Sequence, residues 1–173
     1  MRVFFAALPD AETRARIAAA ADALELKVAV PTDDYHMTLA FVGEVPAELL
    51  ETLRQVGAAQ RGRTFSVRFD TYEHWSKARV LVVAAADIPA SLHRFWEALH
   101  GDLAQHHLAL EPQSLRPHVT IARKVSQAPV LPAMRAFEWS IRMFSLMQST
   151  SSEVTPRYTV LDTWPLLDDG AAS

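Results

Sequence analysis

The sequence contains no cysteine. A disulfide framework, a thiolate metal site and a cysteine nucleophile are therefore excluded. No stretch approaches the roughly 18 consecutive apolar residues that a membrane-spanning helix needs. The apolar run Val3–Leu8 is also short for the core of a signal peptide. We therefore expect a cytoplasmic protein that does not enter a membrane.

The chain also lacks a run of basic residues. Its 17 basic and 20 acidic side chains give a net charge of −3, whereas a protein that follows a nucleic-acid backbone usually carries a basic stripe. The acidic residues form no paired motif with the spacing of a two-metal site, which argues against a metal nuclease. If the protein acts on RNA, we expect it to bind a small part of it, such as a terminal phosphate.

No Gly/Ser-rich linker divides the 173 residues, so we expect one domain, 1–173, of the α+β class with helices on antiparallel or mixed sheets. The apolar patterning predicts strands over 2–7, 36–42, 64–70, 80–84, 118–122, 137–147 and 157–164. It predicts helices from 11 to about 27, from 46 to about 60 and from 89 to about 107. We expect the tail 168–173 to be disordered.

The most informative feature is a weak internal repeat, in which His, an apolar residue, Thr, an apolar residue and Ala follow one another. It occurs at 36–40 and again at 118–122, each time on a predicted strand. Residues two apart share one face of a strand, so His36 projects with Thr38, and His118 with Thr120. We expect the two strands to lie in equivalent lobes and to turn these four side chains toward one groove.

Such a groove suits phosphodiester cleavage without a metal. Two histidines on opposite sides of one phosphorus can supply both the base and the acid, because imidazole takes either role near neutral pH. The hydroxyls of Thr38 and Thr120 can hydrogen-bond the non-bridging oxygens, where negative charge must be held. The residues alone leave another interpretation open, in which His and Thr on two ordinary strands only satisfy each other.

The stretches around the two motifs, 36–44 and 116–123, closely resemble those of the two-histidine (2H) phosphoesterases, in particular the bacterial RNA 2',3'-cyclic phosphodiesterases, also described as 2'-5' RNA ligases. The opening strand 2–9 and the closing pattern around Phe144 and Arg157–Tyr158 are similar too, so the resemblance covers essentially the whole chain. It implies a bilobal fold, with two pseudo-symmetric lobes of sheet and outer helices around a central groove. It also implies hydrolysis of the 2',3'-cyclic phosphate of an RNA 3' end or a nucleotide to a 2'-phosphate. We expect a monomer without cofactor.

The resemblance also assigns roles to the motif residues. It implies that His36 and His118 are the catalytic acid–base pair and that Thr38 and Thr120 bind the substrate phosphate. On the same ground we take His118 as the base that activates water and His36 as the acid that protonates the leaving 3'-oxygen.

Two further site residues follow from the resemblance. The aromatic residue five positions after the first histidine stacks on the nucleobase, and here it is Phe41. The arginine five positions after the second histidine contacts the phosphate, and here it is Arg123. Strict alternation would place both side chains on the face opposite the histidines, so we expect each strand to bend, bulge or end near Ala40 and Ala122.

Other hypotheses stay open at this point. The chain could be an ATP-independent 2'-5' RNA ligase, in which a 5'-hydroxyl replaces water, or a module that binds a nucleotide or RNA end without turnover. Phe41 could be a plain core residue, and Arg123 a solvated strand end. His93, His100 and His107 fall seven apart, wider than the i, i+4 spacing of helical metal ligands, so we expect a solvated helix face there and no metal site.

Overall fold

The computed structural model describes residues 1–108, 110, 114–150 and 157–168. The helices are α1 (Ala11–Asp22), α2 (Leu50–Ala59) and α3 (Ala90–Gln105), with the short 3-10 turns η1 (Thr32–Asp34) and η2 (Ala47–Leu49). The strands are β1 (Arg2–Ala7), β2 (Met37–Glu44), β3 (Phe65–Phe69), β4 (Thr71–Trp75), β5 (Val80–Ala84), β6 (His118–Arg123), β7 (Phe137–Ile141), β8 (Met143–Ser149) and β9 (Tyr158–Pro165).

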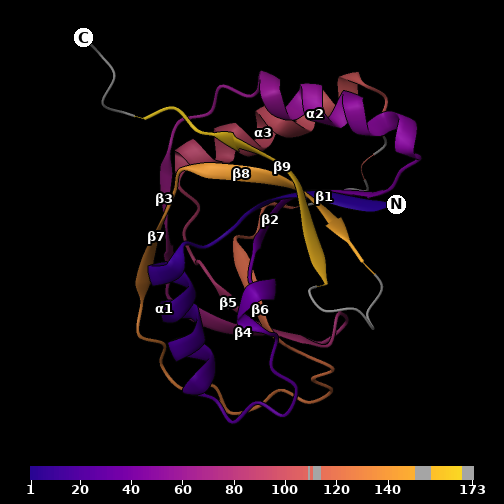
Figure 1. The fold of residues 1–173 in the computed structure, drawn as a ribbon. Helices are drawn as coiled ribbons and strands as arrows, with labels where there is room; N and C mark the ends of the chain where they lie inside the picture. The colour runs from indigo at the N-terminus through magenta and orange to yellow at the C-terminus, as the bar shows by residue number, and fades with distance from the viewer. Residues whose placement is uncertain (109, 111–113, 151–156, 169–173) are drawn as a thin grey trace.

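Antiparallel strands form three sheets, with the orders β2-β1-β8-β9, β3-β7 and β4-β5-β6. Figure 1 shows α2 and α3 over the four-stranded sheet in the upper half, and α1 with the other two sheets in the lower half. The strands that carry the repeated motif, β2 and β6, each lie at the edge of their sheet. The predicted α+β class and the two-lobed arrangement are therefore confirmed.

Helix α1 is shorter than the sequence predicted. It begins after Asp10, whose carboxylate accepts a hydrogen bond from a first-turn N–H at 2.7 Å and thereby serves as the N-cap. It ends at Asp22 and not near Lys27, because the segment that follows pairs with β6. There the N–H of Val30 donates to the carbonyl of Ile121 at 2.9 Å.

Four other elements differ from the prediction. The single strand expected over 137–147 is two strands, β7 and β8, because the chain crosses at Arg142 from the β3-β7 sheet to the four-stranded sheet. Strand β4 was missed, since Tyr72 is its one buried side chain and the apolar alternation is weak. Strand β2 continues through Gly43. The φ angle of this residue is +90°, a value that glycine adopts without strain. The predicted second helix opens with the 3-10 turn η2.

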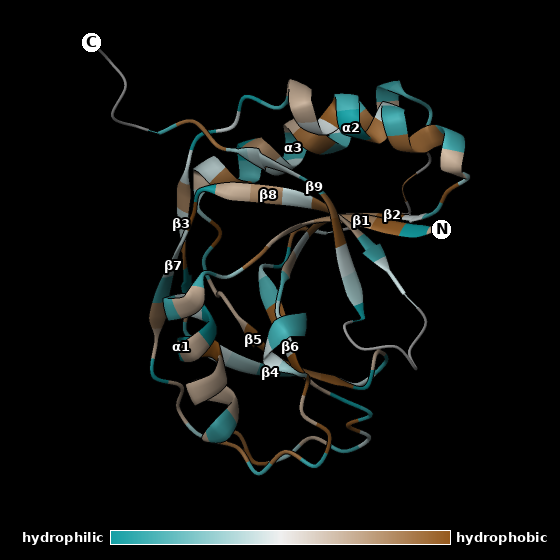
Figure 2. Cartoon of the chain, viewed as in Figure 1, coloured by the Kyte–Doolittle hydropathy of each residue, from teal (hydrophilic) through white to brown (hydrophobic). Residues whose placement is uncertain are grey.

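The main hydrophobic core draws buried side chains from both lobes, including Phe5, Leu39 and Leu146 from the upper sheet and Val83 and Ile121 from the lower. Strands β1 and β5 are largely hydrophobic, while α2 carries hydrophilic residues on its outer turns (Figure 2). No helix within the described ranges is long and apolar enough to cross a membrane. Most of the tail expected to be disordered lies outside the described residues; within them, Asp168 pairs with Arg142 at 3.2 Å.

Candidate active site

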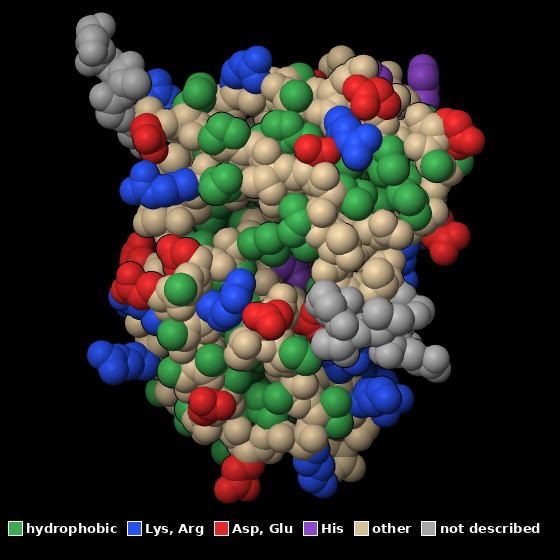
Figure 3. Space-filling model, viewed as in Figure 1, with side chains coloured by type: hydrophobic (Ala, Val, Ile, Leu, Met, Phe, Trp, Pro, Cys, Tyr) green, Lys and Arg blue, Asp and Glu red, His purple; other side chains and the backbone are tan. Residues whose placement is uncertain are grey.

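A cavity of about 680 Å³ lies where the two lobes meet, a size usual for a small-ligand site. Its lining includes all six residues selected from the sequence, namely His36, Thr38, Phe41, His118, Thr120 and Arg123. Figure 3 shows histidine atoms near the middle of this face, between the upper and lower halves. The structure therefore brings the two motifs together at one cavity.

A one-residue bulge explains how Phe41 reaches this cavity. Consecutive residues of β1 pair with Thr38 and Ala40, so Leu39 is the extra residue in β2. Leu39 is 1% exposed, and beyond it the alternation of side chains is reversed. Phe41 thus projects from the same face as His36.

The second motif contains the equivalent bulge. Consecutive residues of β5 pair with Thr120 and Ala122, so Ile121 is the extra residue in β6. Ile121 is 0% exposed, and Arg123 returns to the face of His118 in the same way. The irregularity expected near Ala40 and Ala122 is therefore present in both strands.

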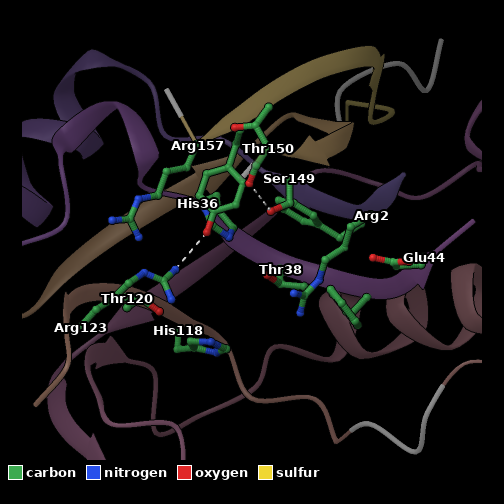
Figure 4. A pocket seen from close by; sticks show the side chains of 13 residues that line it. Arg2, His36, Thr38, Glu44, His118, Thr120, Arg123, Ser149, Thr150 and Arg157 are labelled. Carbon is green, nitrogen blue, oxygen red and sulfur yellow. Dashed lines mark hydrogen bonds between the residues drawn. The ribbon is translucent and has the colours of Figure 1, made fainter. Parts of the chain in front are cut away.

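Backbone carbonyls orient both histidine rings. The Nδ1–H of His36 donates to the carbonyl of Asp34 at 2.8 Å, and the Nδ1–H of His118 donates to the carbonyl of Arg116 at 2.6 Å. These bonds favour the tautomer whose Nε2 is unprotonated when the ring is neutral. Figure 4 shows the two rings on opposite sides of the cavity. Each Nε2 is therefore left for a substrate.

An aromatic side chain packs against each histidine. The ring of Tyr158 lies 4.6 Å from that of His36, and the ring of Trp75 lies 4.3 Å from that of His118, measured between centroids. Behind them are two small apolar clusters on the cavity side of the sheets. One consists of Phe4, Ala6 and Met147, and the other of Val80, Val82 and Ala84. The two halves of the site thus share the same plan.

Burial makes both rings harder to protonate in the ligand-free protein. It lowers the pKa of His36 to about 4, and the positive charge of Arg123 acts in the same direction, against the hydrogen bond to Asp34. Burial also lowers the pKa of His118, with Arg116 adding to the effect and Glu73 opposing it. Both imidazoles are therefore neutral at pH 7, with an Nε2 that can accept a proton.

The structure adds cavity residues that the sequence analysis did not select: Arg2, Phe4, Glu44, Ser149, Thr150, Arg157 and Tyr158. They come from β1, from the end of β2 and from the β8 and β9 ends, so no local motif connects them to the histidines. The available signal was the family likeness of the opening strand 2–9, of the stretch 36–44 and of Arg157–Tyr158. Arg116, two residues before His118, does not line the cavity and forms an ion pair with Glu73.

His93 and His100 lie on α3, and their side chains do not converge. His93 pairs with Glu97 at 3.2 Å, and His100 contacts the carbonyl of Leu39 at 3.1 Å. Across the described part of the chain, no group of three or more His, Cys, Asp or Glu side chains could hold a metal ion.

Two lobes that each present a His-x-Thr strand to a shared cavity define the two-histidine phosphoesterase class of protein. The chain belongs to the 2'-5' RNA ligase superfamily, whose family model matches residues 9–153. It is 31% identical over 139 residues to the RNA 2',3'-cyclic phosphodiesterase of Escherichia coli strain K12, covering 79% of this chain and 78% of that protein. It is 29% identical over 185 residues to the RNA 2',3'-cyclic phosphodiesterase of Thermus thermophilus, covering 96% and 90%.

Solved structures give the same result. A crystal structure of a phosphoesterase superimposes with a TM-score of 0.87 at 28% identity, covering 96% of this chain and 98% of that one. The crystal structure of E. coli LigT complexed with 3'-AMP superimposes with a TM-score of 0.85 at 28% identity, covering 95% and 97%. The bilobal fold expected from the sequence is therefore that of the family.

Proposed function

We propose that this protein hydrolyses the 2',3'-cyclic phosphate of RNA 3' ends and nucleotides to a 2'-phosphate, without a metal. The observation that carries the proposal is the placement of His36 and His118 in one cavity, each with Nδ1 bonded to a carbonyl and Nε2 left for a ligand. Two relatives are named RNA 2',3'-cyclic phosphodiesterases, and a LigT structure holds 3'-AMP. These names support the same substrate class.

The reaction needs one neutral and one protonated ring. In the proposed mechanism His118 takes a proton from water as the water oxygen bonds to phosphorus. His36 gives its proton to the 3'-oxygen as the bond between phosphorus and that oxygen breaks. The products are a 2'-phosphate and a 3'-hydroxyl. Thr38, Thr120 and Arg123 hold the non-bridging oxygens, where negative charge builds up.

The low pKa of the free His36 ring, about 4, makes its protonation depend on the substrate. An anionic phosphate beside an imidazole favours the imidazolium and raises its pKa. Binding of the cyclic phosphate would thus favour the protonated form of His36, which the reaction requires as the acid. Phe41 is proposed to stack on the nucleobase at the end of the cavity where Arg2 also lies.

The test is turnover of a nucleoside 2',3'-cyclic phosphate in excess EDTA, with the product identified by chromatography. We expect a 2'-phosphate, and a loss of at least 10²-fold in rate for His36→Ala and for His118→Ala. His93→Ala, on an exposed helix face outside the cavity, is the matched control and should keep full activity. Absence of turnover, or activity lost in chelator and restored by a divalent ion, would contradict the proposal. The cytoplasmic location and the monomeric state expected from the sequence stay predictions.

A further inference from the structure

The arginines of this chain differ in whether an acidic side chain neutralises them. Six arginines outside the cavity have a carboxylate within ion-pair distance: Arg14, Arg16, Arg54, Arg68, Arg116 and Arg142. The three that line the cavity are Arg2, Arg123 and Arg157, and none of them forms such a pair within the described residues. Their positive charge is therefore available to a ligand.

This charge exceeds what one cyclic phosphate requires. A cyclic phosphate carries a single negative charge, and Arg123 is already proposed to meet it. The guanidinium of Arg2 lies over the ring of Phe41, 4.8 Å from its centroid, where the nucleobase is proposed to bind. Glu44 also lines the cavity at that end. Arg157 is left without an assigned ligand.

Backbone contacts hold Arg157 in place. Its N–H donates to Oδ1 of Asp34 at 3.2 Å, and its carbonyl accepts from the N–H of Thr150 at 2.8 Å. Asp34 is 3% exposed, and its own carbonyl orients His36. One buried residue thus ties the position of Arg157 to that of the histidine, and such preorganisation lowers the entropic cost of binding a ligand.

The position of Arg157 matches one particular part of an RNA chain. In Figure 4 it lies at the end of the cavity opposite Arg2 and Glu44, with the two histidines between. A ribose carries its base on C1' and continues to the preceding nucleotide through C4' and C5', at the other end of the ring. With the base beside Phe41 and the cyclic phosphate between the histidines, the 5'-oxygen is directed toward Arg157.

We propose that Arg157 binds the phosphodiester on the 5' side of the terminal ribose, so that the preferred substrate is the end of an RNA chain and not a mononucleotide. This inference rests on the proposed hydrolase function. A guanidinium pairs well with phosphate oxygens, and a phosphate contact conveys no base sequence. Arg157 therefore selects for a chain irrespective of its sequence.

The first test compares kcat/KM for three cyclic phosphates with the same terminal base: the nucleoside, the nucleoside bearing a 5'-monophosphate, and a dinucleotide. The wild-type protein should prefer the dinucleotide to the nucleoside by roughly 10-fold or more, the gain expected of one charge-assisted phosphate contact. Arg157→Ala should reduce this preference to near one, and Arg157→Lys should keep part of it. Arg142→Ala, which removes an exposed arginine outside the cavity, is the matched control and should keep the full preference.

The second test isolates the charge of the linkage. Replacing the linkage of the dinucleotide by a neutral methylphosphonate should lower kcat/KM of the wild-type protein about as much as Arg157→Ala does. The same replacement should not lower kcat/KM of the Arg157→Ala variant any further. For the ordinary dinucleotide, log kcat/KM against log salt concentration should be shallower by roughly 0.7 in Arg157→Ala, because one phosphate contact is lost.

The outcomes separate this inference from the proposed function. If the wild-type protein turns over none of the three substrates, the hydrolase function fails. If it treats nucleoside and dinucleotide alike, or if wild type and Arg157→Ala respond equally to the methylphosphonate, the hydrolase stands and the Arg157 site is wrong. If the 5'-monophosphate raises kcat/KM and the diester does not, the assignment to an RNA chain is overturned.

Discussion

The side chain of Arg123 donates a hydrogen bond from Nη2 to the hydroxyl of Tyr158 at 2.9 Å, while the ring of Tyr158 packs edge-on against His36. Tyr158 belongs to β9 in the four-stranded sheet and Arg123 to β6 in the three-stranded sheet. This contact therefore joins the two sides of the cavity. One tyrosine positions both the guanidinium proposed to bind the phosphate and the imidazole proposed as the acid.

The first prediction follows from this contact. Tyr158→Phe keeps the ring against His36 and removes the acceptor that orients Arg123, a loss of about 1–2 kcal/mol. We expect kcat/KM for a cyclic phosphate to fall roughly 5–30-fold, with little change in melting temperature. The matched control is Tyr72→Phe, which removes a buried hydrogen bond to the carbonyl of Ala20 outside the cavity. It should lower the melting temperature and leave kcat/KM unchanged. The same pattern in Tyr158→Phe would show that Tyr158 is purely structural.

The second prediction separates the roles of the two histidines. An aryl phosphodiester with a 4-nitrophenolate leaving group needs no acid, so it should largely restore the activity of His36→Ala and leave His118→Ala inactive. The double variant should be little worse than the worse single one, because the two rings act as a unit. Restored activity in His118→Ala would reverse the assignment. No restoration in either variant would mean that both rings mainly hold the phosphate.

The third prediction concerns Phe41. Its truncation to Ala should weaken nucleotide binding by roughly 1–3 kcal/mol, the usual contribution of a base stacked on an aromatic ring. Titration with a 2'-nucleotide would measure the change in Kd. Phe69→Ala, which empties a fully buried site in the core, shows what a structural phenylalanine does: it should cost about 3–5 kcal/mol of stability. A Phe41 variant with a lower melting temperature and an unchanged Kd would place Phe41 in the core.

The fourth prediction is a dependence of stability on pH. The folded state lowers the pKa of His36 from 6.5 to about 4, so below pH 6.5 the unfolded chain binds more protons than the folded one. Unfolding free energy should therefore fall as the pH drops, by about 2 kcal/mol from this group between pH 7 and pH 5. Urea titrations of the wild-type protein and of His36→Gln measure it, since the variant lacks the ionising ring and should lose less. His93→Gln, which removes an exposed histidine outside the cavity, is the control. Its unfolding free energy should depend on pH as that of the wild type does. The same pH dependence of the unfolding free energy in all three proteins would contradict the lowered pKa of His36.

The period of two residues was sufficient to select His36, Thr38, His118 and Thr120, because it can be read directly on two predicted strands. Phe41 and Arg123 came from the family resemblance, because strict alternation places them on the opposite face. The sequence was not sufficient for Arg157 and Tyr158, whose approach to His36 depends on the pairing of β8 with β9 and on the buried carboxylate of Asp34. Strand pairing between distant segments is a property of the whole fold. The same reason explains the split between β7 and β8, which a continuous apolar pattern conceals.

The bulges in β2 and β6 determine the spacing in the sequence between the residues that face the cavity. On a regular strand, even offsets share a face, so positions zero, two and four would meet the substrate. Here the cavity-facing positions are zero, two and five, and the residues at position four, Ala40 and Ala122, are 0% and 1% exposed. The odd offset is the result of the one-residue bulge in the backbone. The small alanine at position four packs inward, where a regular strand would have turned its side chain toward the cavity. Deleting Leu39 or Ile121 would therefore remove the bulge without changing the pairing of the residues that follow, and Phe41 or Arg123 would keep its face at an even offset of four.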